Sequence, residues 1–289
     1  MIFLDNIKRI KKLDSQGMWQ SIESLGLQCQ QAWEEAQEVK IPKSYRNIDN
    51  ILINGMGGSG LGGHIIEFLY GGELKVPFKV INSYKLPGFV NQRTLYILSS
   101  YSGTTEEVLA TLSEARKRRA RLLVICAGGV LARQAKKNRI PGYIFTPRFN
   151  PCGQPRMGLG YAIVGLITML KKCGLFRVTE AEFKGIIKTI VLLHRDFGLK
   201  TPISRNKAKK TAQAVQASIP IIVGAGHLAG NTHVIANQIN ENSKNFSAYF
   251  LISELNHHLM EGLLFPKGNR KNLHFLFIES SQYLSLIHI

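Results

Sequence analysis

Acidic residues are scarce in this chain of 289 residues, which has 19 Asp and Glu against 37 Lys and Arg. The formal net charge of +18 at pH 7 raises the question of a nucleic-acid partner. The basic runs at residues 116–121, 133–139 and 205–210 come without a helix-turn-helix, a zinc finger or an aromatic RNA-binding motif. Most lie at expected helix ends, where cations complement the helix dipole. We therefore expect solvated basic faces that attract anionic substrates, and no nucleic-acid partner.

Cysteines and long apolar runs are also few. The four cysteines (Cys29, Cys126, Cys152 and Cys173) show no C-x-x-C pair and no metal-ligand spacing, which is typical of reduced thiols in a cytosolic protein. The most apolar stretch, residues 157–170, is shorter than the roughly 20 residues of a membrane span, and no apolar run follows the basic N-terminal segment. We expect a cytoplasmic protein with no membrane association, no signal peptide and no metal.

Short apolar strands alternate with helices along most of the chain. Strands are expected at residues 51–54, 78–81, 94–98, 122–125 and 143–145, followed by a linker at 149–155, helices at 157–172, 179–197 and 207–217, and a further strand at 219–223. This alternation predicts an α/β fold with parallel sheets flanked by helices, in flavodoxin-like layering. We expect two domains, residues 1–149 with a leading helix and residues 150–289.

The first expected strand runs directly into Gly55-Met-Gly-Gly-Ser-Gly60. A strand, a glycine turn and a helix present backbone N–H groups to a phosphate. The pattern is not a nucleotide P-loop and matches the dinucleotide fingerprint only loosely. A tight turn that serves only helix–sheet packing explains this segment equally well.

The segment Ser99-Ser-Tyr-Ser-Gly-Thr-Thr105 is rich in hydroxyl groups and also lies between a strand and a helix. Thr104 as a helix N-cap, with Glu107 completing a capping box, would explain one of these hydroxyl groups and leave four unexplained. Several O–H and N–H donors at a helix start indicate a small phosphate monoester as the ligand.

The helix expected after strand 219–223 contains an unusual number of asparagines, which are poor helix formers. Leu228, Thr232, Ile235 and Ile239 form its expected buried stripe. Glu241 lies beside that stripe among the asparagines. A solvated pair of Glu241 with Lys244, worth about 0.2–0.5 kcal/mol, would not require them, and local rules are broken mostly where function demands it. Glu241 is therefore the first candidate for catalysis.

Five segments in order carry a resemblance to a known family: Gly55-Met-Gly-Gly-Ser-Gly60, Ser100-Tyr-Ser-Gly-Thr-Thr-Glu106, Gln154-Pro-Arg156, Asn240-Glu-Asn-Ser-Lys244 and Glu254-Leu-Asn-His257. Together they resemble the bifunctional phosphoglucose/phosphomannose isomerases, which are built from two sugar isomerase (SIS) domains. The resemblance implies a cytoplasmic enzyme of carbohydrate metabolism and glycolysis. It would interconvert glucose 6-phosphate with fructose 6-phosphate through an enediolate, without a cofactor, and mannose 6-phosphate is the second candidate substrate.

The same resemblance implies roles for single residues. The sugar phosphate would be held by residues of the two turns: Gly58, Ser59, Ser100, Ser102 and Thr105. Glu241 would move the proton between C1 and C2, Arg156 would stabilise the enediolate, and His257 would assist ring opening from the neighbouring subunit of a homodimer. Arg156 fits this role physically because a cation at a helix start opposes the dipole, a cost that function would explain.

The chain departs from the family pattern in three places. His258-Leu259 stands where the family has Asn-Glu, Thr104 stands where asparagine is common, and the apolar tail of residues 283–289 is unlike the family, which we interpret as a truncated or out-of-frame end. The alternative function is a sugar-phosphate-binding SIS protein that has lost turnover with its C-terminal segment. For His257 the alternative is a histidine without a catalytic role in the polar loop expected at 254–258, where His258 is a rival candidate.

Overall fold

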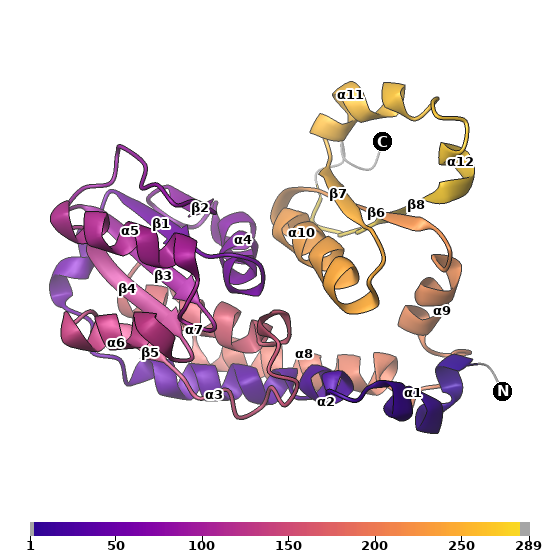
Figure 1. The fold of residues 1–289 in the computed structure, drawn as a ribbon, viewed down its shortest axis with the longest axis horizontal. Coiled ribbons are helices and arrows are strands. Elements are labelled where there is room, and N and C mark those ends of the chain that lie inside the picture. The colour runs from indigo at the N-terminus through magenta and orange to yellow at the C-terminus, as the bar shows by residue number, and fades with distance from the viewer. Residues whose placement is uncertain (1–2, 284–289) are drawn as a thin grey trace.

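The computed structural model describes residues 3–283, which form two α/β units, each built on a parallel sheet (Figure 1). Of the apolar tail at residues 283–289, residues 284–289 lie outside the described residues. The first sheet has the strand order β2-β1-β3-β4-β5, and this is the order of flavodoxin-like folds. The second sheet has the order β7-β6-β8. These findings confirm the predicted fold class.

The three central strands of the first sheet are apolar and buried along most of their length, whereas its two edge strands are partly exposed. Its strands are β1 (Asn50–Asn54), β2 (Phe78–Ile81), β3 (Thr94–Ser100), β4 (Arg121–Cys126) and β5 (Gly142–Ile144). Every residue of β3 is buried, because helices cover both sides of its sheet. In the register, Ile51 of β1 lies beside Leu95 of β3.

Helices cover the two faces in two separate cores. Trp33 of α3 (Leu25–Gln37) and Leu166 of α7 (Leu159–Lys172) pack on the face that carries Ile53 and Ile97. On the other face, the apolar residues of α5 (Glu106–Lys117) and α6 (Gly129–Lys137) pack against the residues of β1 and β3 that point that way. Helix α7 thus packs on the first sheet although it follows the expected linker. The predicted domain boundary after residue 149 stays a prediction.

The rest of the described chain forms the leading segments, the connection and the second unit. The leading segments are η1 (Phe3–Asp5), α1 (Ile7–Leu13), α2 (Met18–Glu23) and the short turn η2 (Lys43–Arg46), and the connection is α8 (Glu180–Phe197) and α9 (Lys207–Ala214). The second unit contains β6 (Ile219–Gly224), η4 (Gly226–Leu228), α10 (Ala229–Gln238), β7 (Ala248–Leu251), α11 (Glu254–Gly262), α12 (Asn269–Asn272) and β8 (Leu273–Phe277).

Two local predictions in the second unit are wrong. The segment 254–258, expected as a polar loop, begins helix α11, because Leu255 and Leu259 are four residues apart and both pack against the second sheet. Ile235, expected in the buried stripe of α10, is 37% exposed. Thr232 of the expected stripe is buried as predicted, and the other buried side chains of α10 are those of Ala229, Val234 and Ala236.

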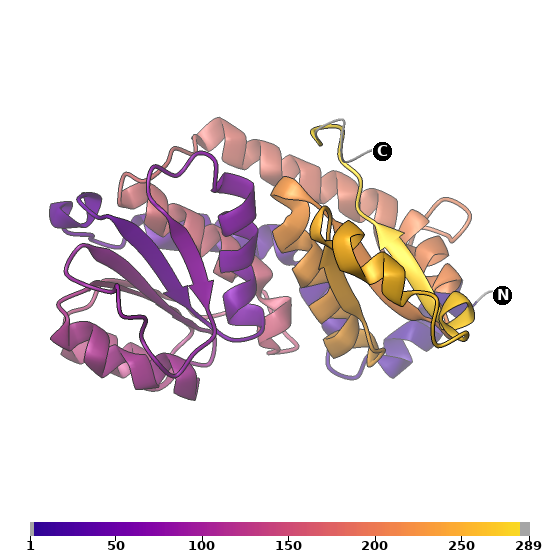
Figure 2. The same cartoon turned by 90° about the horizontal axis from the view of Figure 1, so that it is seen from above.

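The two units meet where α4 (Gly58–Tyr70) lies against α10, which Figure 2 shows between the two sheets. Leu61 and Ile65 of α4 form a small core with Val234 of α10. The helices approach closely because Gly230 has no side chain. A Cβ atom at Gly230 would lie 2.3 Å from the carbonyl oxygen of His64 and 2.7 Å from the Cα of Ile65.

Replacing Gly230 with alanine should therefore push α10 away from α4. Backbone atoms on α4 cannot move aside as a flexible side chain would, so we expect a loss of about 1–3 kcal/mol of unfolding free energy, measured by urea denaturation. Gly185→Ala is the matched control, since Gly185 lies in α8 with nothing within 4 Å of the added Cβ. It should be neutral or stabilising by up to about 1 kcal/mol. Equal effects of the two substitutions would contradict a close contact at Gly230.

Candidate functional site

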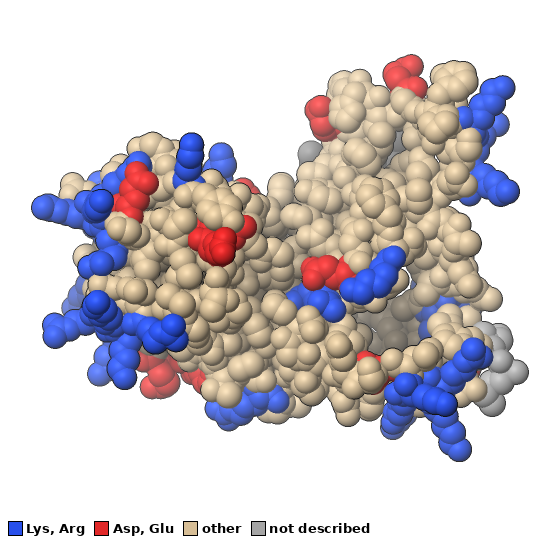
Figure 3. All heavy atoms as spheres, viewed as in Figure 1, with Lys and Arg blue, Asp and Glu red and all other residues tan. Residues whose placement is uncertain are grey.

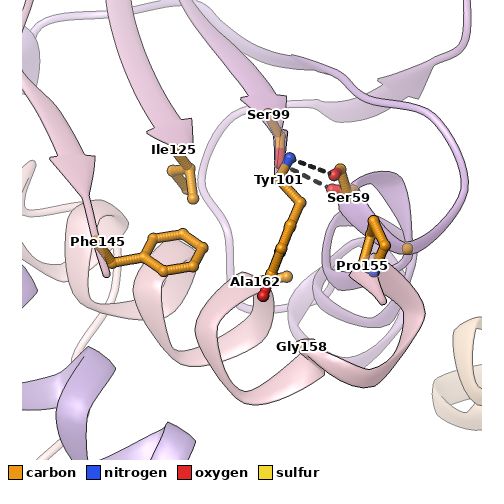
Figure 4. A pocket seen from close by; sticks show the side chains of 9 residues that line it. Ser59, Ser99, Tyr101, Ile125, Phe145, Pro155, Gly158 and Ala162 are labelled. Atoms are coloured by element: carbon orange, nitrogen blue, oxygen red, sulfur yellow. Dashed lines mark hydrogen bonds between the residues drawn. The ribbon is translucent and has the colours of Figure 1, made fainter. Parts of the chain in front are cut away.

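The two turns singled out in the sequence lie side by side at the carboxyl edge of the first sheet. They follow β1 and β3, neighbouring strands whose helical connections leave in different directions, and such a switch point is where α/β sheets bind ligands. The hydroxyl oxygen Oγ of Ser59 accepts a hydrogen bond of 2.7 Å from the backbone N–H of Tyr101. Ser99 donates one of 2.8 Å to the carbonyl of Ser59. Figure 4 shows both bonds at a small pocket that Pro155 and Gly158 also line.

The hydroxyl groups of the second turn are bonded to one another and to its backbone. Ser100 is fully buried, and its Oγ lies 2.6 Å from Oγ1 of Thr105 and accepts a bond of 3.0 Å from the N–H of Gly103. Ser102 is exposed, and its Oγ lies 2.9 Å from Oγ1 of Thr104. Ser100 thus shapes the turn, while Ser102 faces solvent. A direct contact of either with phosphate stays a prediction.

Neither helix that starts at this edge is capped by a side chain. The N-cap of α5 is Thr105, and that of α4 is Gly57; neither position has a side-chain capping bond. The alternative of a capping box at Thr104 is therefore wrong, because Thr104 bonds to Ser102 instead. Two adjacent helix starts without side-chain caps are an anion-binding arrangement, although at α4 the N–H groups of Ser59 and Gly60 already donate to the carbonyl groups of Met56 and Gly57.

Gly58 brings the first turn of α4 against the segment that carries Arg156. A Cβ atom at Gly58 would lie 2.7 Å from the backbone nitrogen of Arg156 and 2.8 Å from the carbonyl oxygen of Pro155. Arg156 lies in a short 3-10 turn, η3 (Pro155–Met157), immediately before α7, as the sequence predicted. The absence of a side chain at Gly58 therefore places Arg156 beside Ser59, the next residue along α4.

Arg156 faces Glu241 from across the contact between the units. Nη1 of Arg156 lies 3.5 Å from Oε2 of Glu241, and the two side chains are 14% and 40% exposed. Lys244 does not compete for this carboxylate, because its Nζ donates to the backbone carbonyl of Glu241. The predicted base and the predicted cation are thus brought together beside the two turns.

Glu241 lies in a π-helical turn, η5 (Ile239–Ser243), that continues α10. Such wide turns lack the regular α-helical bonds and are frequent at functional sites. The asparagines supply replacements: the side chain of Asn240 donates to the carbonyl groups of Ala236 and Ser247 and accepts from the N–H of Ser247. Asn245 donates to the carbonyl of Ser218. The asparagine cluster therefore holds the π turn against the second sheet.

His257 does not join this group within the single chain. It lies on α11, which follows the carboxyl end of β7, whereas the π turn precedes the amino end of that strand. The side chain is exposed. Neighbouring His258 contacts only its own helix among the described residues, at 3.5 Å from Glu254.

Four site features were not assigned from the sequence. Gln154 and Asn242 bond the guanidinium of Arg156, and Asn150 donates to the hydroxyl of Tyr101. Burial raises the pKa of the Tyr101 hydroxyl above its ordinary value. The motifs contained Gln154 and Asn242, but only the fold shows which atoms they contact.

Within residues 3–283 no group of three or more His, Cys, Asp or Glu side chains could hold a metal ion, and no helix there is long and apolar enough to cross a membrane. The four cysteines are free. Lys and Arg side chains lie in several separate groups on the face shown in Figure 3. The chemical content of the site is thus an anion-binding edge with one carboxylate and one guanidinium.

Comparison with known proteins adds independent evidence. Residues 204–287 match the bacterial phospho-glucose isomerase C-terminal SIS domain. A bifunctional phosphoglucose/phosphomannose isomerase of Caldicellulosiruptor bescii is 33% identical over 255 residues, covering 86% of this chain and 73% of that protein. Another, of Thermoplasma volcanium, is 31% identical and covers 76% of this chain and 66% of that protein.

A solved structure has the same fold. A candidate phosphosugar isomerase of Clostridium difficile 630 superposes with a TM-score of 0.68 at 13% identity, covering 94% of this chain and 77% of that one. The likeness extends over both units and agrees with the predicted architecture of two parallel sheets flanked by helices.

A histidine on the helix that leads to Glu241 gives a pH dependence. His233 of α10 lies between His64 of α4, at 4.5 Å between ring centroids, and Tyr249 of β7, at 4.6 Å. Burial first, and the neighbouring imidazole of His64 second, lower the pKa of His233 from 6.5 to about 4. Glu67 lies 3.7 Å from His64 and faces the same contact.

Below a pH of about 6.5, His233 of the unfolded chain binds a proton, whereas His233 of the folded chain stays neutral until the pH approaches 4. The free energy of unfolding therefore falls as the pH drops toward 4. We expect His233→Gln to reduce this fall, measured as the difference in urea unfolding free energy between pH 7.5 and pH 4.5. His258→Gln, at an exposed histidine, is the control and should keep the wild-type fall. The same pH dependence in all three proteins would show that His233 titrates normally.

Proposed function

Because the chain belongs to the bifunctional phosphoglucose/phosphomannose isomerase family, as its motifs predicted, we propose that it is an aldose–ketose isomerase. Its substrates would be glucose 6-phosphate and mannose 6-phosphate, each interconverted with fructose 6-phosphate. The observation that carries this proposal is the pair of Arg156 and Glu241, 3.5 Å apart, beside two uncapped helix starts. We place the reaction in the cytoplasm, as a step of glycolysis.

In the proposed reaction the sugar phosphate lies on the N–H groups at the starts of α4 and α5, with Ser59, Ser102 and Thr105 beside it. The carboxylate of Glu241 takes the proton from C2 of the open-chain aldose and returns it to C1, while the hydroxyl proton on O2 moves to O1, which gives the ketose. Such a positioned base contributes about 10²–10⁴ in rate. The guanidinium of Arg156 stabilises the negative charge that develops on the oxygens of the enediolate.

Use of both aldoses follows from the proposed intermediate. Glucose 6-phosphate and mannose 6-phosphate differ only in configuration at C2, and C2 is planar in the enediolate. A proton returned to one face of C2 gives one aldose and a proton returned to the other face gives its epimer. A single base can therefore serve both substrates only where the site leaves room for the enediolate to rotate about its C2–C3 bond, so that either face of C2 can turn toward Glu241.

We further propose a homodimer with a shared site, in which His257 reaches the substrate bound by the partner subunit and assists ring opening. In the described chain His257 is exposed and lies at the other end of β7 from Glu241. The exposed side chains of Leu193 and Phe197, four residues apart on one face of α8, support an interface between copies, since exposed apolar surface marks interaction sites.

Glu241→Gln tests the proposed base. The substitution keeps the shape and removes the ability to accept a proton, so kcat with fructose 6-phosphate should fall by about 10²–10⁴ while binding of the substrate persists. Activity is measured by coupling glucose 6-phosphate formation to its dehydrogenase. Glu38→Gln, at an exposed carboxylate at the end of α3, should have no effect. Near-normal kcat in Glu241→Gln would remove Glu241 from the mechanism. If the wild-type chain binds the substrate without turnover, the alternative of a non-catalytic sugar-phosphate-binding protein is correct.

Mixed dimers test the shared site. A dimer of one Glu241→Gln chain and one His257→Ala chain contains one site with both substitutions and one with neither. After unfolding and refolding together in equal amounts, about half of the dimers are mixed, so about a quarter of the wild-type sites are restored by symmetry. Activity measured as above should rise well beyond the sum of the separate variants. No gain on mixing, with mixed dimers demonstrated by differently tagged chains, would contradict a shared site.

A further inference from the structure

The guanidinium of Arg156 is held by amide side chains from both units. Its Nε donates a hydrogen bond of 2.6 Å to Oδ1 of Asn242, in the π turn after α10. Its Nη1 donates one of 3.0 Å to Oε1 of Gln154, two residues earlier in the chain. The same Nη1 faces the carboxylate of Glu241 at 3.5 Å.

The backbone around Arg156 is tied to the same turn. Nε2 of Gln238, the last residue of α10, donates a bond of 2.7 Å to the carbonyl of Arg156. The amide of Asn242 in turn donates to Oε1 of Gln238. Arg156, Asn242 and Gln238 therefore form a closed set of hydrogen bonds across the contact between the units.

This set directs the donors of the guanidinium. Arginine carries five N–H groups in a rigid plane. Asn242 takes the one on Nε, and Gln154 and Glu241 lie against Nη1. In the described part of the chain, Nη2 has no hydrogen bond or ion pair to protein. Both of its N–H groups are thus left for a ligand, in a plane fixed from two sides.

We propose that Asn242, assisted by Gln154, is a positioning residue that presents Nη2 of Arg156 to the enediolate oxygens. The inference rests on the proposed isomerase function and goes beyond it, because it assigns a role to an amide that touches no reacting atom. Neutral amides suit the role because they accept hydrogen bonds from the guanidinium and leave its charge intact, whereas carboxylates would neutralise it. Fixed donors aimed at developing charge stabilise the transition state more than the ground state.

Loss of the Asn242 bond should therefore lower kcat and leave KM nearly unchanged. Without it the Arg156 side chain can rotate about its last bonds, and Nη1 can close on Glu241, so the cation must be reoriented in each turnover. In Asn242→Ala we expect kcat with fructose 6-phosphate to fall at least about tenfold, with KM within about twofold. Asn242→Gln keeps a neutral amide that can accept from the guanidinium and should retain more of kcat than Asn242→Ala.

Asn237→Ala is the matched control, since Asn237 lies one helical turn before Glu241 and its side chain bonds to His233 rather than to the site. It should keep wild-type kcat and KM. Gln154→Ala removes the other amide that bonds the guanidinium of Arg156. It lies outside the π turn and should show a smaller loss of kcat. Thermal melting of each protein shows that the variants are folded.

The outcome separates this inference from the proposed function. Wild-type kcat in both Asn242→Ala and Gln154→Ala, or a rise in KM at constant kcat, would overturn the positioning role. Absence of turnover in the wild type would instead overturn the proposed function. In that case calorimetric binding of 5-phospho-D-arabinonate, whose planar carboxylate copies the two enediolate oxygens, decides: about tenfold weaker binding by Asn242→Ala supports the set of bonds, and equal binding contradicts it.

Discussion

The packing of α4 against α10 is the contact on which the site depends. Helix α4 starts at the glycine turn of the first sheet, and α10 ends in the π turn that carries Glu241. Each helix therefore carries one part of the site: a phosphate-binding start on one and the base on the other. Gly230 allows the backbones of α4 and α10 to approach each other, and Gly58 allows the segment before α7 to lie against α4. The start of α4, the turn η3 and the π turn, which are distant in sequence, therefore lie close together.

The two sheets contribute opposite edges to this meeting. The first provides its carboxyl edge at β1 and β3, which is the usual ligand edge of a parallel sheet. The second provides its amino edge, because α10 runs back along β6 before the chain reaches the π turn. The glycine turn after β6, which resembles the phosphate turns in sequence, therefore lies at the far end of α10 from Glu241. Similar local sequences thus have different roles according to which end of the sheet they occupy.

Much of this arrangement could be predicted from the sequence, and the exceptions have physical reasons. The strands and the two turns could be predicted from local patterns. Arg156 and Glu241 could be predicted because a cation at a helix start and asparagines within a helix are unfavourable unless function requires them. The packing roles do not follow in this way. The hydroxyl group of Ser100 is buried and bonds within its own turn, a packing role that the hydroxyl-rich pattern did not show, while its contact with phosphate stays a prediction. The face of α10 that becomes buried depends on how closely α4 approaches, so Val234 is buried and Ile235 is not.

His257 and Asn242 mark the two limits of such prediction. Helix α11, which carries His257, could not be predicted from its polar sequence alone, because it depends on the packing of Leu255 and Leu259 against the second sheet. The bond from Arg156 to Asn242 joins residues 86 positions apart, and no spacing rule reaches that far. Propensity shows that the asparagines are out of place in a helix, but only the packed chain shows which carbonyl or guanidinium each one serves.

Turnover of fructose 6-phosphate in D2O, followed by NMR, tests the central claim most directly. A carboxylate that carries the proton between C1 and C2 exchanges it with solvent in part of the turnovers. The account therefore predicts deuterium at C2 of the glucose 6-phosphate formed and at C1 of the recovered ketose. Product formation with complete retention of hydrogen at both carbons would contradict proton transfer by Glu241.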